Sequence, residues 1–373
     1  MDPFAHTLFG AALAETGLKR TTRYATVTLL AGANLPDVDV IAHMAGTDAS
    51  LYFRRGWSHG ILALILLPLL LTGLVWLWHR WRSHPVGQAS LSGGQAPPFN
   101  TGVILALSYL GVLSHLFLDW LNTYGVRLLM PFDGRWFYGD TLFIIDPWVW
   151  LLTGVGVVLA WSHRPAARAG WLLLAALASL LIITSELVTA PVKVLWLVGV
   201  VAVIGLRWRR PSRAFVQHLT RAGLATLVLY IGAVYGMARL AESTLAERYP
   251  EASVVQSNPV PGLPHAHRLI LVEDRHYRII QPDGRSQRVP RPEPDAVVRQ
   301  ALKDESIRGF ANWTRHPYWE VDETERGWEV RFYDLRYVEP GKRARAGPDI
   351  AFARVEVLRE EVQEDFAPAR DQD

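Results

Sequence analysis

The chain of 373 residues contains no cysteine. Disulfide bonds, thiolate metal sites and cysteine nucleophiles are therefore excluded, and any metal site must be built from histidine and carboxylate side chains. The sequence also lacks a glycine-rich phosphate loop and any repeat of solenoid period. A metal or catalytic site in this chain is therefore expected to consist of histidine and carboxylate residues.

Acidic residues are scarce in the first two thirds of the chain. Residues 1–241 contain eight Asp and two Glu, whereas 25 of the 35 acidic residues follow residue 241. Half of all residues are hydrophobic. This contrast predicts an all-α membrane helix bundle over residues 1–241 and a soluble α+β domain over residues 242–373. The formal net charge of +3 is too small to indicate a nucleic-acid partner, and none is expected.

Apolar runs predict several membrane-spanning helices. About 20 residues are needed to cross a hydrocarbon core of about 30 Å. Six runs of this kind occur, at roughly 57–78, 101–121, 143–162, 169–189, 190–207 and 215–239. Two shorter apolar segments, about 4–17 and 23–34, precede them as short spans or as a buried helical hairpin. The start lacks the basic region and cleavage site of a secretory signal, so we expect it to be retained.

The basic residues favour one orientation. If the turn at residues 19–23 is cytoplasmic and each segment crosses once, 12 of the 18 Lys and Arg residues before residue 242 are inside and 6 are outside. This places both chain ends on the outer face. We therefore expect a multi-pass protein of the bacterial inner membrane whose C-terminal domain lies on the periplasmic side.

The remaining segments are loops and the soluble domain. Residues 83–100 are rich in Gly, Ser, Pro and Gln, which predicts a flexible cytoplasmic connection. Residues 267–290 predict two strands around a turn, and residues 295–303 predict a short helix. The segments GWEVRFYDLRYVE and DIAFARVEVLRE alternate apolar and polar residues as half-buried strands do.

Six ionisable residues lie at or near membrane depth, where such groups are costly and are therefore paired or functional. His115 and Asp119 are four apart on a predicted helix, so that both face one side and can bind one cation. Pro36 is expected to end the preceding helix, and an extended NLPDVD segment would point Asp37 and Asp39 the same way. The remaining two residues are His6 and His59.

Orientation adds an independent argument. With the orientation taken from basic residues alone, all six residues fall at the outer ends of their segments. Segment ends at one level can converge on a site for Zn²⁺, Mn²⁺ or two metal ions. Each residue also has a plainer interpretation: His6 as a packed hydrogen-bonded side chain, the aspartates as helix caps, and His115 with Asp119 as a structural pair.

Other candidates are weaker. Glu15 lies nine residues after His6, which is half a helical turn out of phase. Arg127 and Arg135, in the outer loop at 122–147, are candidates for holding a phosphate or carboxylate, or for pairing with nearby aspartates. Asp146, which precedes Pro147, is expected to shape the start of the next span. Tyr124 is interpreted as an interfacial anchor.

Five blocks together resemble a known family. In order, DPFAHTLFGAAL, ANLPDVDV, RRGWSHG, SHLFLDWLNTYGVRLLMPF and IIDP, over residues 2–148, resemble the blocks of the YdjM/YfhP-like family of inner-membrane predicted metal-dependent hydrolases. The order of aspartate, histidine and HxxxD is also similar to that of zinc-dependent phospholipase C and the S1/P1 nucleases. The resemblance implies a metal site made of His6, Asp37, Asp39, His59, His115 and Asp119. One departure is Gly60, where the family usually has a hydroxyl residue.

The predicted function is a membrane-bound metal-dependent hydrolase of a phosphoester or other lipid-linked ester. A divalent metal, zinc by preference and manganese as the alternative, would activate water and polarise the scissile group. Asp37 or Asp39, whichever is not a tight metal ligand, would act as general base, and Arg127 would bind an anionic substrate. The alternatives are a cation-binding transporter or sensor whose aspartates line an ion path, and a bundle that only anchors the C-terminal domain.

Overall fold

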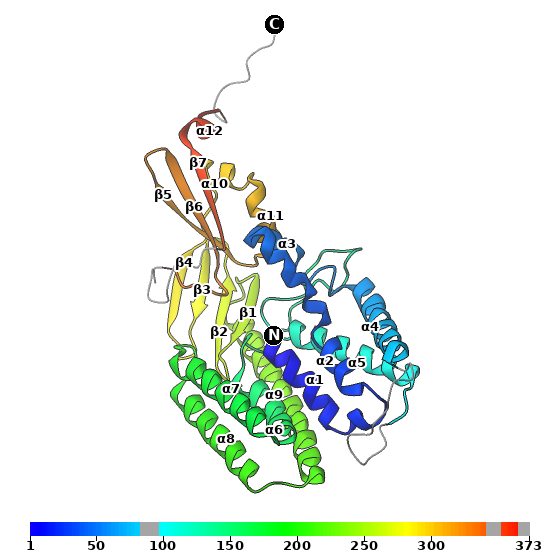
Figure 1. The fold of residues 1–373 in the computed structure, drawn as a ribbon. Coiled ribbons are helices and arrows are strands. Elements are labelled where there is room, and N and C mark those ends of the chain that lie inside the picture. The colour runs from blue at the N-terminus through cyan, green and yellow to red at the C-terminus, as the bar shows by residue number, and fades with distance from the viewer. Residues whose placement is uncertain (83–96, 341–351, 365–373) are drawn as a thin grey trace. The chain divides into compact units, whose positions relative to one another are not determined.

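A computed structural model describes residues 1–82, 97–340 and 352–364 (Figure 1). The described chain divides into two compact units. The helical unit comprises Met1–Val38, Arg55–Ala241 and Ser257–His267, and the C-terminal unit comprises Asp39–Arg54, Glu242–Gln256 and Arg268–Asp373. The predicted flexible connection at 83–100 lies mostly outside the described residues.

Helices are the main regular elements of the described residues as far as residue 248. In chain order they are α1 (Pro3–Glu15), η1 (Leu18–Arg20), α2 (Ala25–Gly32), η2 (Leu35–Ala45), α3 (Thr47–Phe53), α4 (Ile61–Arg82), α5 (Thr101–Trp120), α6 (Pro147–Trp161), α7 (Pro165–Thr184), α8 (Ala190–Trp208) and α9 (Arg213–Arg248). The membrane helix bundle predicted from the apolar runs is confirmed. The predicted outer loop leads from α5 to α6 and carries no helix before Pro147, where α6 begins.

Among the described residues, five helices are long and apolar enough to cross a membrane, namely α4, α5, α7, α8 and α9. The number rises to six if α2 and η2, which are bent by 41° at their junction, form one span. The run at 143–162 gives a shorter helix than predicted, because α6 begins only at Pro147, where Asp146 accepts hydrogen bonds from the backbone N–H groups of Trp148 and Val149. Helix α9 is longer than predicted and extends to Arg248.

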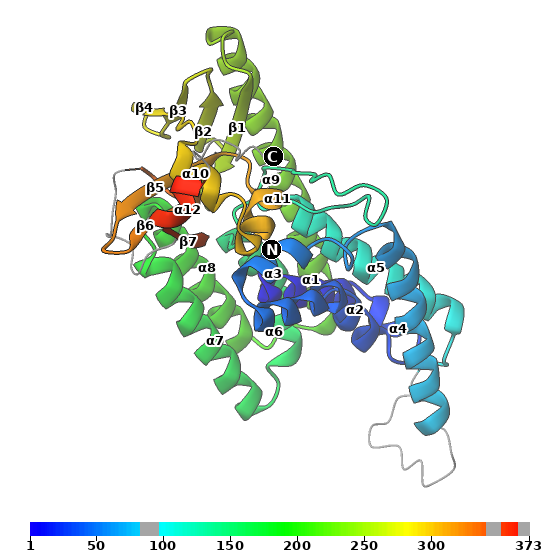
Figure 2. The same ribbon diagram turned by 90° about the horizontal axis from the view of Figure 1, so that it is seen from above.

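Glycines bring three helices of this unit close together. A Cβ on Gly111 of α5 would lie 2.9 Å from Cα of Gly32 in α2, and one on Gly10 of α1 would lie 2.9 Å from the Leu29 carbonyl oxygen. Small residues of this kind let helix backbones approach within a bilayer. Figures 1 and 2 show α1, α2 and α5 side by side. The close approach at Gly111 also sets the position of His115, one helical turn further along α5.

The C-terminal unit is built on antiparallel strands and short helices. One sheet has the order β1 (Val254–Pro259), β2 (His267–Val272), β3 (His276–Ile280), β4 (Ser286–Pro290), and the other β5 (Pro317–Glu323), β6 (Gly327–Asp334), β7 (Ala353–Leu358). The helices are α10 (Ala296–Ala301), η3 (Glu305–Ile307), α11 (Arg308–Trp313) and α12 (Arg359–Glu364). The predicted α+β class is confirmed, although residues 267–290 form three strands instead of two.

The segment Asp39–Arg54 packs within the C-terminal unit. The backbone N–H of Gly309, in α11, donates to the Asp48 carboxylate of α3 at 2.5 Å. A Cβ on Gly309 would lie 2.1 Å from the Asp48 carbonyl oxygen, so that only glycine permits this approach. The segment that follows Asp37 in the chain is therefore fixed to the C-terminal unit.

A buried polar pair makes the C-terminal unit sensitive to acid. Burial lowers the pKa of His316 to about 3. Burial would raise the pKa of Asp334, but Arg336, which donates from Nε and Nη2 at 2.9 Å, outweighs burial and lowers it to about 2. Between these values and the ordinary ones of 6.5 and 3.8, the unfolded chain binds more protons than the folded chain. The stability of the unit is therefore lost progressively as the pH falls below 6.5.

We expect the unit to lose roughly 2–3 kcal/mol of stability between pH 7 and pH 4, mainly because His316 must be protonated on unfolding. Peptide-resolved hydrogen exchange of the full chain, corrected for intrinsic rates, measures this loss in β6. The variant His316→Gln has no group to titrate and should show a flatter profile. Identical profiles for wild type and variant would contradict the assignment.

Candidate metal centre

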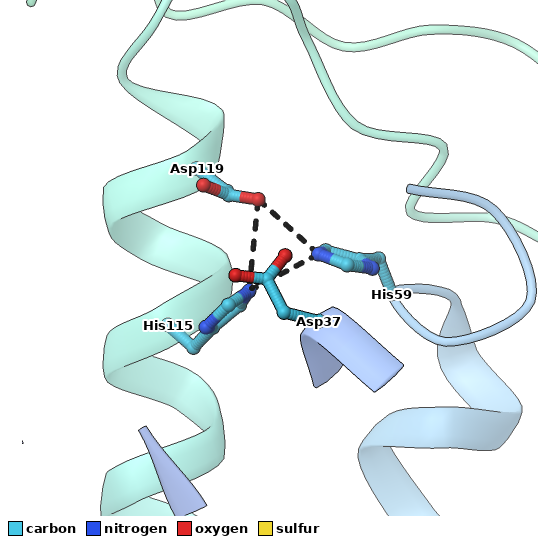
Figure 3. A group of neighbouring side chains, drawn as sticks. All are labelled: Asp37, His59, His115 and Asp119. Atoms are coloured by element: carbon cyan, nitrogen blue, oxygen red, sulfur yellow. Dashed lines mark hydrogen bonds and ion pairs between the residues drawn. The ribbon is translucent and has the colours of Figure 1, made fainter. Parts of the chain in front are cut away.

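Helix α5 provides two of the candidate ligands. His115 and Asp119 lie one turn apart and are both fully buried. The Nδ1 atom of His115 lies 2.8 Å from the Ala33 carbonyl oxygen, which can only accept, so Nδ1 carries the proton and Nε2 presents its lone pair. That lone pair points toward Asp119, whose Oδ2 atom is 3.6 Å away (Figure 3). The predicted arrangement of the HxxxD pair on one helix face is confirmed.

His59 reaches the same point from the turn before α4. Its backbone N–H donates to the Gly56 carbonyl at 3.0 Å, which fixes the turn. Its Nε2 atom lies 3.2 Å from Nε2 of His115 and 3.2 Å from Oδ2 of Asp119. Its Nδ1 atom lies 2.8 Å from the hydroxyl of Ser58. The hydroxyl partner that Gly60 cannot provide is therefore supplied by the residue before the histidine.

Asp37 completes the group from η2. Its Oδ1 atom is 3.8 Å from His115 Nε2, and its side chain is 14% exposed, whereas the other three are fully buried. The expected extended conformation of NLPDVD is wrong, because residues 35–45 form a 3₁₀ helix. Proline is tolerated at a helix start, and three residues per turn direct residues two apart to different sides. Asp37 and Asp39 therefore do not point the same way.

The four side chains fit one divalent ion. Asp37, His59, His115 and Asp119 each offer a ligand atom, and these atoms all lie within 4.8 Å of one another (Figure 3). Two atoms that each lie about 2.0–2.1 Å from a tetrahedral zinc ion are roughly 3.3–3.4 Å apart. The measured separations of 3.2, 3.6 and 3.8 Å are close to this spacing. The donor set of two imidazoles and two carboxylates suits zinc, and also manganese.

His6 lies beside the group of four. Its Nε2 atom is 3.1 Å from Oδ1 of Asp119, and its ring stacks on that of His115 with centroids 3.8 Å apart. It thus contacts the Asp119 oxygen that faces away from the two histidines of the group. The structure places His6 where it orients Asp119, and a direct ligand role for it stays a prediction.

Arg55 is the site residue that the sequence reasoning missed. Its Nη2 atom donates to Oδ1 of Asp119 at 3.0 Å, and its Nη1 donates to Asn122 at 2.9 Å. The Tyr124 ring covers the guanidinium at 4.6 Å, so Tyr124 supports the site and is not merely an interfacial anchor. The amino group of Met1 also contacts Asp119. No spacing rule connects Arg55 with Asp119, which is 64 positions away, so no pattern in the sequence indicates this pairing.

Two further predicted residues are not part of the group of four. Asp39 belongs to the C-terminal unit, where its carboxylate is 3.9 Å from Nε of Arg54. Arg127 is 4% exposed, and its guanidinium lies over the Trp136 ring at 5.1 Å. A Cβ on Gly56 would lie 2.5 Å from Arg127 Nη2, so this arginine packs against the turn that carries His59. The roles of Asp39 as ligand or base and of Arg127 in substrate binding stay predictions.

The other polar residues have structural roles. Asp146 caps α6 and also accepts from the Tyr230 hydroxyl at 2.8 Å. Arg135 pairs with Asp133 at 2.6 Å on the surface. Glu15 accepts from Trp161 Nε1 at 2.8 Å and pairs with Lys19. None of these residues belongs to the group of four that the described chain brings together.

The fold leaves no room for a side chain at Gly60. A Cβ there would lie 2.3 Å from the Met130 carbonyl oxygen and 2.8 Å from the Met130 Cβ. We expect Gly60→Ser to destabilise the protein by about 1–3 kcal/mol, as overpacking does, and to displace His59. Thermal unfolding in detergent measures the loss. Gly73→Ser, in open space on helix α4, which begins just after Gly60, is the matched control, and an equal effect of both changes would contradict the packing argument.

Comparison with known proteins identifies the family of this chain. The profile of the YdjM inner membrane protein family matches residues 1–190, which include all six candidate ligands. The chain belongs to the YdjM family. The YfhP C-terminal alpha/beta plait domain matches residues 296–343. The chain is also similar to the uncharacterized protein YfhP of Bacillus subtilis (strain 168), at 23% identity over 349 residues, which cover 91% of this chain and 88% of that protein. No solved structure matches.

Membership of the YdjM family and the apolar helices identify a membrane protein of the inner-membrane type. The resemblance to the YdjM/YfhP-like family stated from the sequence is thereby confirmed, and the match to the YfhP C-terminal domain extends it to the second part of the chain. The group of four ligands lies entirely within the part that matches the YdjM family.

Proposed function

We propose that this YdjM-family protein binds a divalent metal ion at Asp37, His59, His115 and Asp119 and hydrolyses a phosphoester or other lipid-linked ester. The observation that carries the proposal is the convergence of four ligand atoms within 4.8 Å, from three separate parts of the chain. Zinc is the preferred ion and manganese the alternative. When bound, the ion supplies a Lewis acid and activates water for attack on the ester.

The burial of the four side chains supports distinct roles for them. His59, His115 and Asp119 are fully buried, whereas Asp37 is 14% exposed and makes the longest contact. A catalytic site keeps one side open to substrate, and Asp37 marks that side. Asp37 is therefore the loosest of the four proposed ligands, and its more open carboxylate would accept a proton from the attacking water. Arg127 remains the candidate for steadying an anionic substrate.

Hydrolysis is tested with purified full-length protein on a p-nitrophenyl phosphodiester and on a short-chain phospholipid. We expect metal-dependent turnover, a loss of about 100-fold or more in Asp37→Asn, and a smaller effect in Asp39→Asn, as removal of a general base costs 10²–10⁴-fold. Asp39→Asn is the matched control, because it is the same substitution only two positions away in the sequence. Metal-loaded protein without turnover of either substrate class would favour the cation sensor or transporter.

The orientation predicted from basic residues is part of the same proposal. We expect the C-terminal unit on the periplasmic side, because 12 of 18 basic residues then lie in the cytoplasm. Alkaline phosphatase fused to the C-terminus should be active, and green fluorescent protein fused there should be dark. The reverse pattern would place the C-terminal unit in the cytoplasm and contradict the predicted orientation.

A further inference from the structure

Two adjoining cavities of the helical unit form an amphipathic site away from the four ligands. The first is an apolar cavity of 210 Å³ among α6, α7 and α8, helices that contact one another (Figure 2). Its walls include aromatic and aliphatic side chains of all three helices and of α1, among them Phe4, Leu8, Trp150, Trp171, Ala175 and Val200. Apart from the tryptophan indoles, only Ser162, Arg168 and Arg207 among its lining residues carry polar side chains.

The second cavity is polar and shares Arg207 with the first. It has a volume of 670 Å³ and is lined by four cationic side chains, Lys19, Arg20, Arg207 and Arg213. Its one acidic residue, Glu15, already pairs with Lys19 and accepts from Trp161. The lining therefore carries a surplus of positive charge next to an apolar channel.

Arg207 is held at the junction of the two cavities. Its Nε and Nη2 atoms donate to the Ser162 carbonyl, the C-cap of α6, at 3.1 and 3.0 Å. The apolar lining of α6 extends from Trp150 to Ser162, about 18 Å at 1.5 Å per residue. Half of a hydrocarbon core of about 30 Å is about 15 Å, so the apolar cavity matches the depth of one leaflet.

We propose that this site binds one phospholipid with an anionic headgroup, with an acyl chain in the apolar cavity and the phosphate beside Arg168 and Arg207. The charge of the site and its position in the helices indicate this occupant. Helices α7 and α8 are candidate membrane spans, and Arg168 and Arg207 lie near their ends. The ends of a membrane span lie at the level of the lipid phosphates. Arginine binds phosphate with paired hydrogen bonds. The inference is independent of the proposed hydrolysis, because none of the four ligands lines either cavity.

Native mass spectrometry of the full chain released from detergent tests the site with dioleoyl phosphatidylglycerol, dioleoyl phosphatidylcholine and glycerol 1-phosphate. We expect retention of phosphatidylglycerol, and little retention of the choline lipid or of the headgroup without chains. The double variant Arg168→Gln/Arg207→Gln should weaken retention roughly 30-fold, about fivefold for each charge near an anionic headgroup. The matched control, Arg164→Gln/Arg209→Gln, removes two exposed arginines that line neither cavity.

A second pair of variants tests the apolar cavity without touching charge. Ala175→Trp should fill the cavity and displace the lipid, whereas Ala176→Trp, on the exposed face of α7, should not. Equal retention of the two lipids, equal effects of the two arginine pairs, or equal effects of the two tryptophan variants would each overturn the proposal. All these measurements use protein without bound metal. Their results therefore do not depend on whether the protein is a hydrolase.

Discussion

Replacement of His115 by alanine should abolish bound metal and hydrolysis together. His115 presents Nε2 to Asp37, His59 and Asp119, at distances between 3.2 and 3.8 Å. Loss of an outer-shell partner typically costs 10–100-fold in metal affinity, and loss of a ligand at the centre of the group should cost about 100-fold or more. Inductively coupled plasma mass spectrometry of purified protein measures the metal content.

His218→Ala is the matched control for this change, because His218 is exposed on α9 and is not part of the group of four. The control should retain the metal content of the wild type. If His115→Ala retains it as well, the metal is bound elsewhere. The same result with intact function would favour the view that the bundle only anchors the C-terminal domain.

Removal of Arg55 should cause the largest loss of stability. Arg55 is 2% exposed and forms a buried ion pair with Asp119, which is fully buried. Breaking such a pair by removing one partner typically costs about 3–5 kcal/mol, because the other charge is left uncompensated. A bound divalent cation would compensate Asp119, so we expect Arg55→Gln to be destabilised more strongly in chelator than in zinc. Thermal unfolding in detergent under both conditions measures this difference.

Arg135→Gln provides the comparison for a surface pair. Arg135 is 73% exposed and pairs with Asp133, and exposed pairs contribute about 0–1 kcal/mol. If Arg55→Gln loses no more stability than Arg135→Gln, the ion pair with Asp119 is not important for the fold. If zinc fails to reduce the loss, the cation does not bind next to Asp119.

Local rules predicted the elements and part of the site. The HxxxD spacing predicted that His115 and Asp119 share a helix face, because the helical period is a property of the local backbone. The length of the apolar runs predicted the membrane helices, and alternation predicted β6 and β7. Of the six residues predicted to converge, Asp37, His59, His115 and Asp119 lie together in one group.

Tertiary contacts account for what sequence could not predict. The partnership of Arg55 with Asp119, and the hydroxyl of Ser58 beside His59, depend on how distant segments pack. The 3₁₀ conformation of η2, whose residues from Asp39 onward belong to the C-terminal unit, follows from no local pattern in the sequence. The sequence does not distinguish Gly32 and Gly111 from other glycines in apolar helices, because their role depends on the close approach of α2 and α5.

X-ray absorption spectroscopy at the metal edge of the purified full-length protein tests the central claim most directly. The proposed site predicts about one divalent ion per chain, with a first shell of two imidazole nitrogens and carboxylate oxygens at about 2.0–2.2 Å. The imidazole signal should fall by half in His59→Ala. A purified protein that binds no ion, or a first shell without imidazole, would contradict the account.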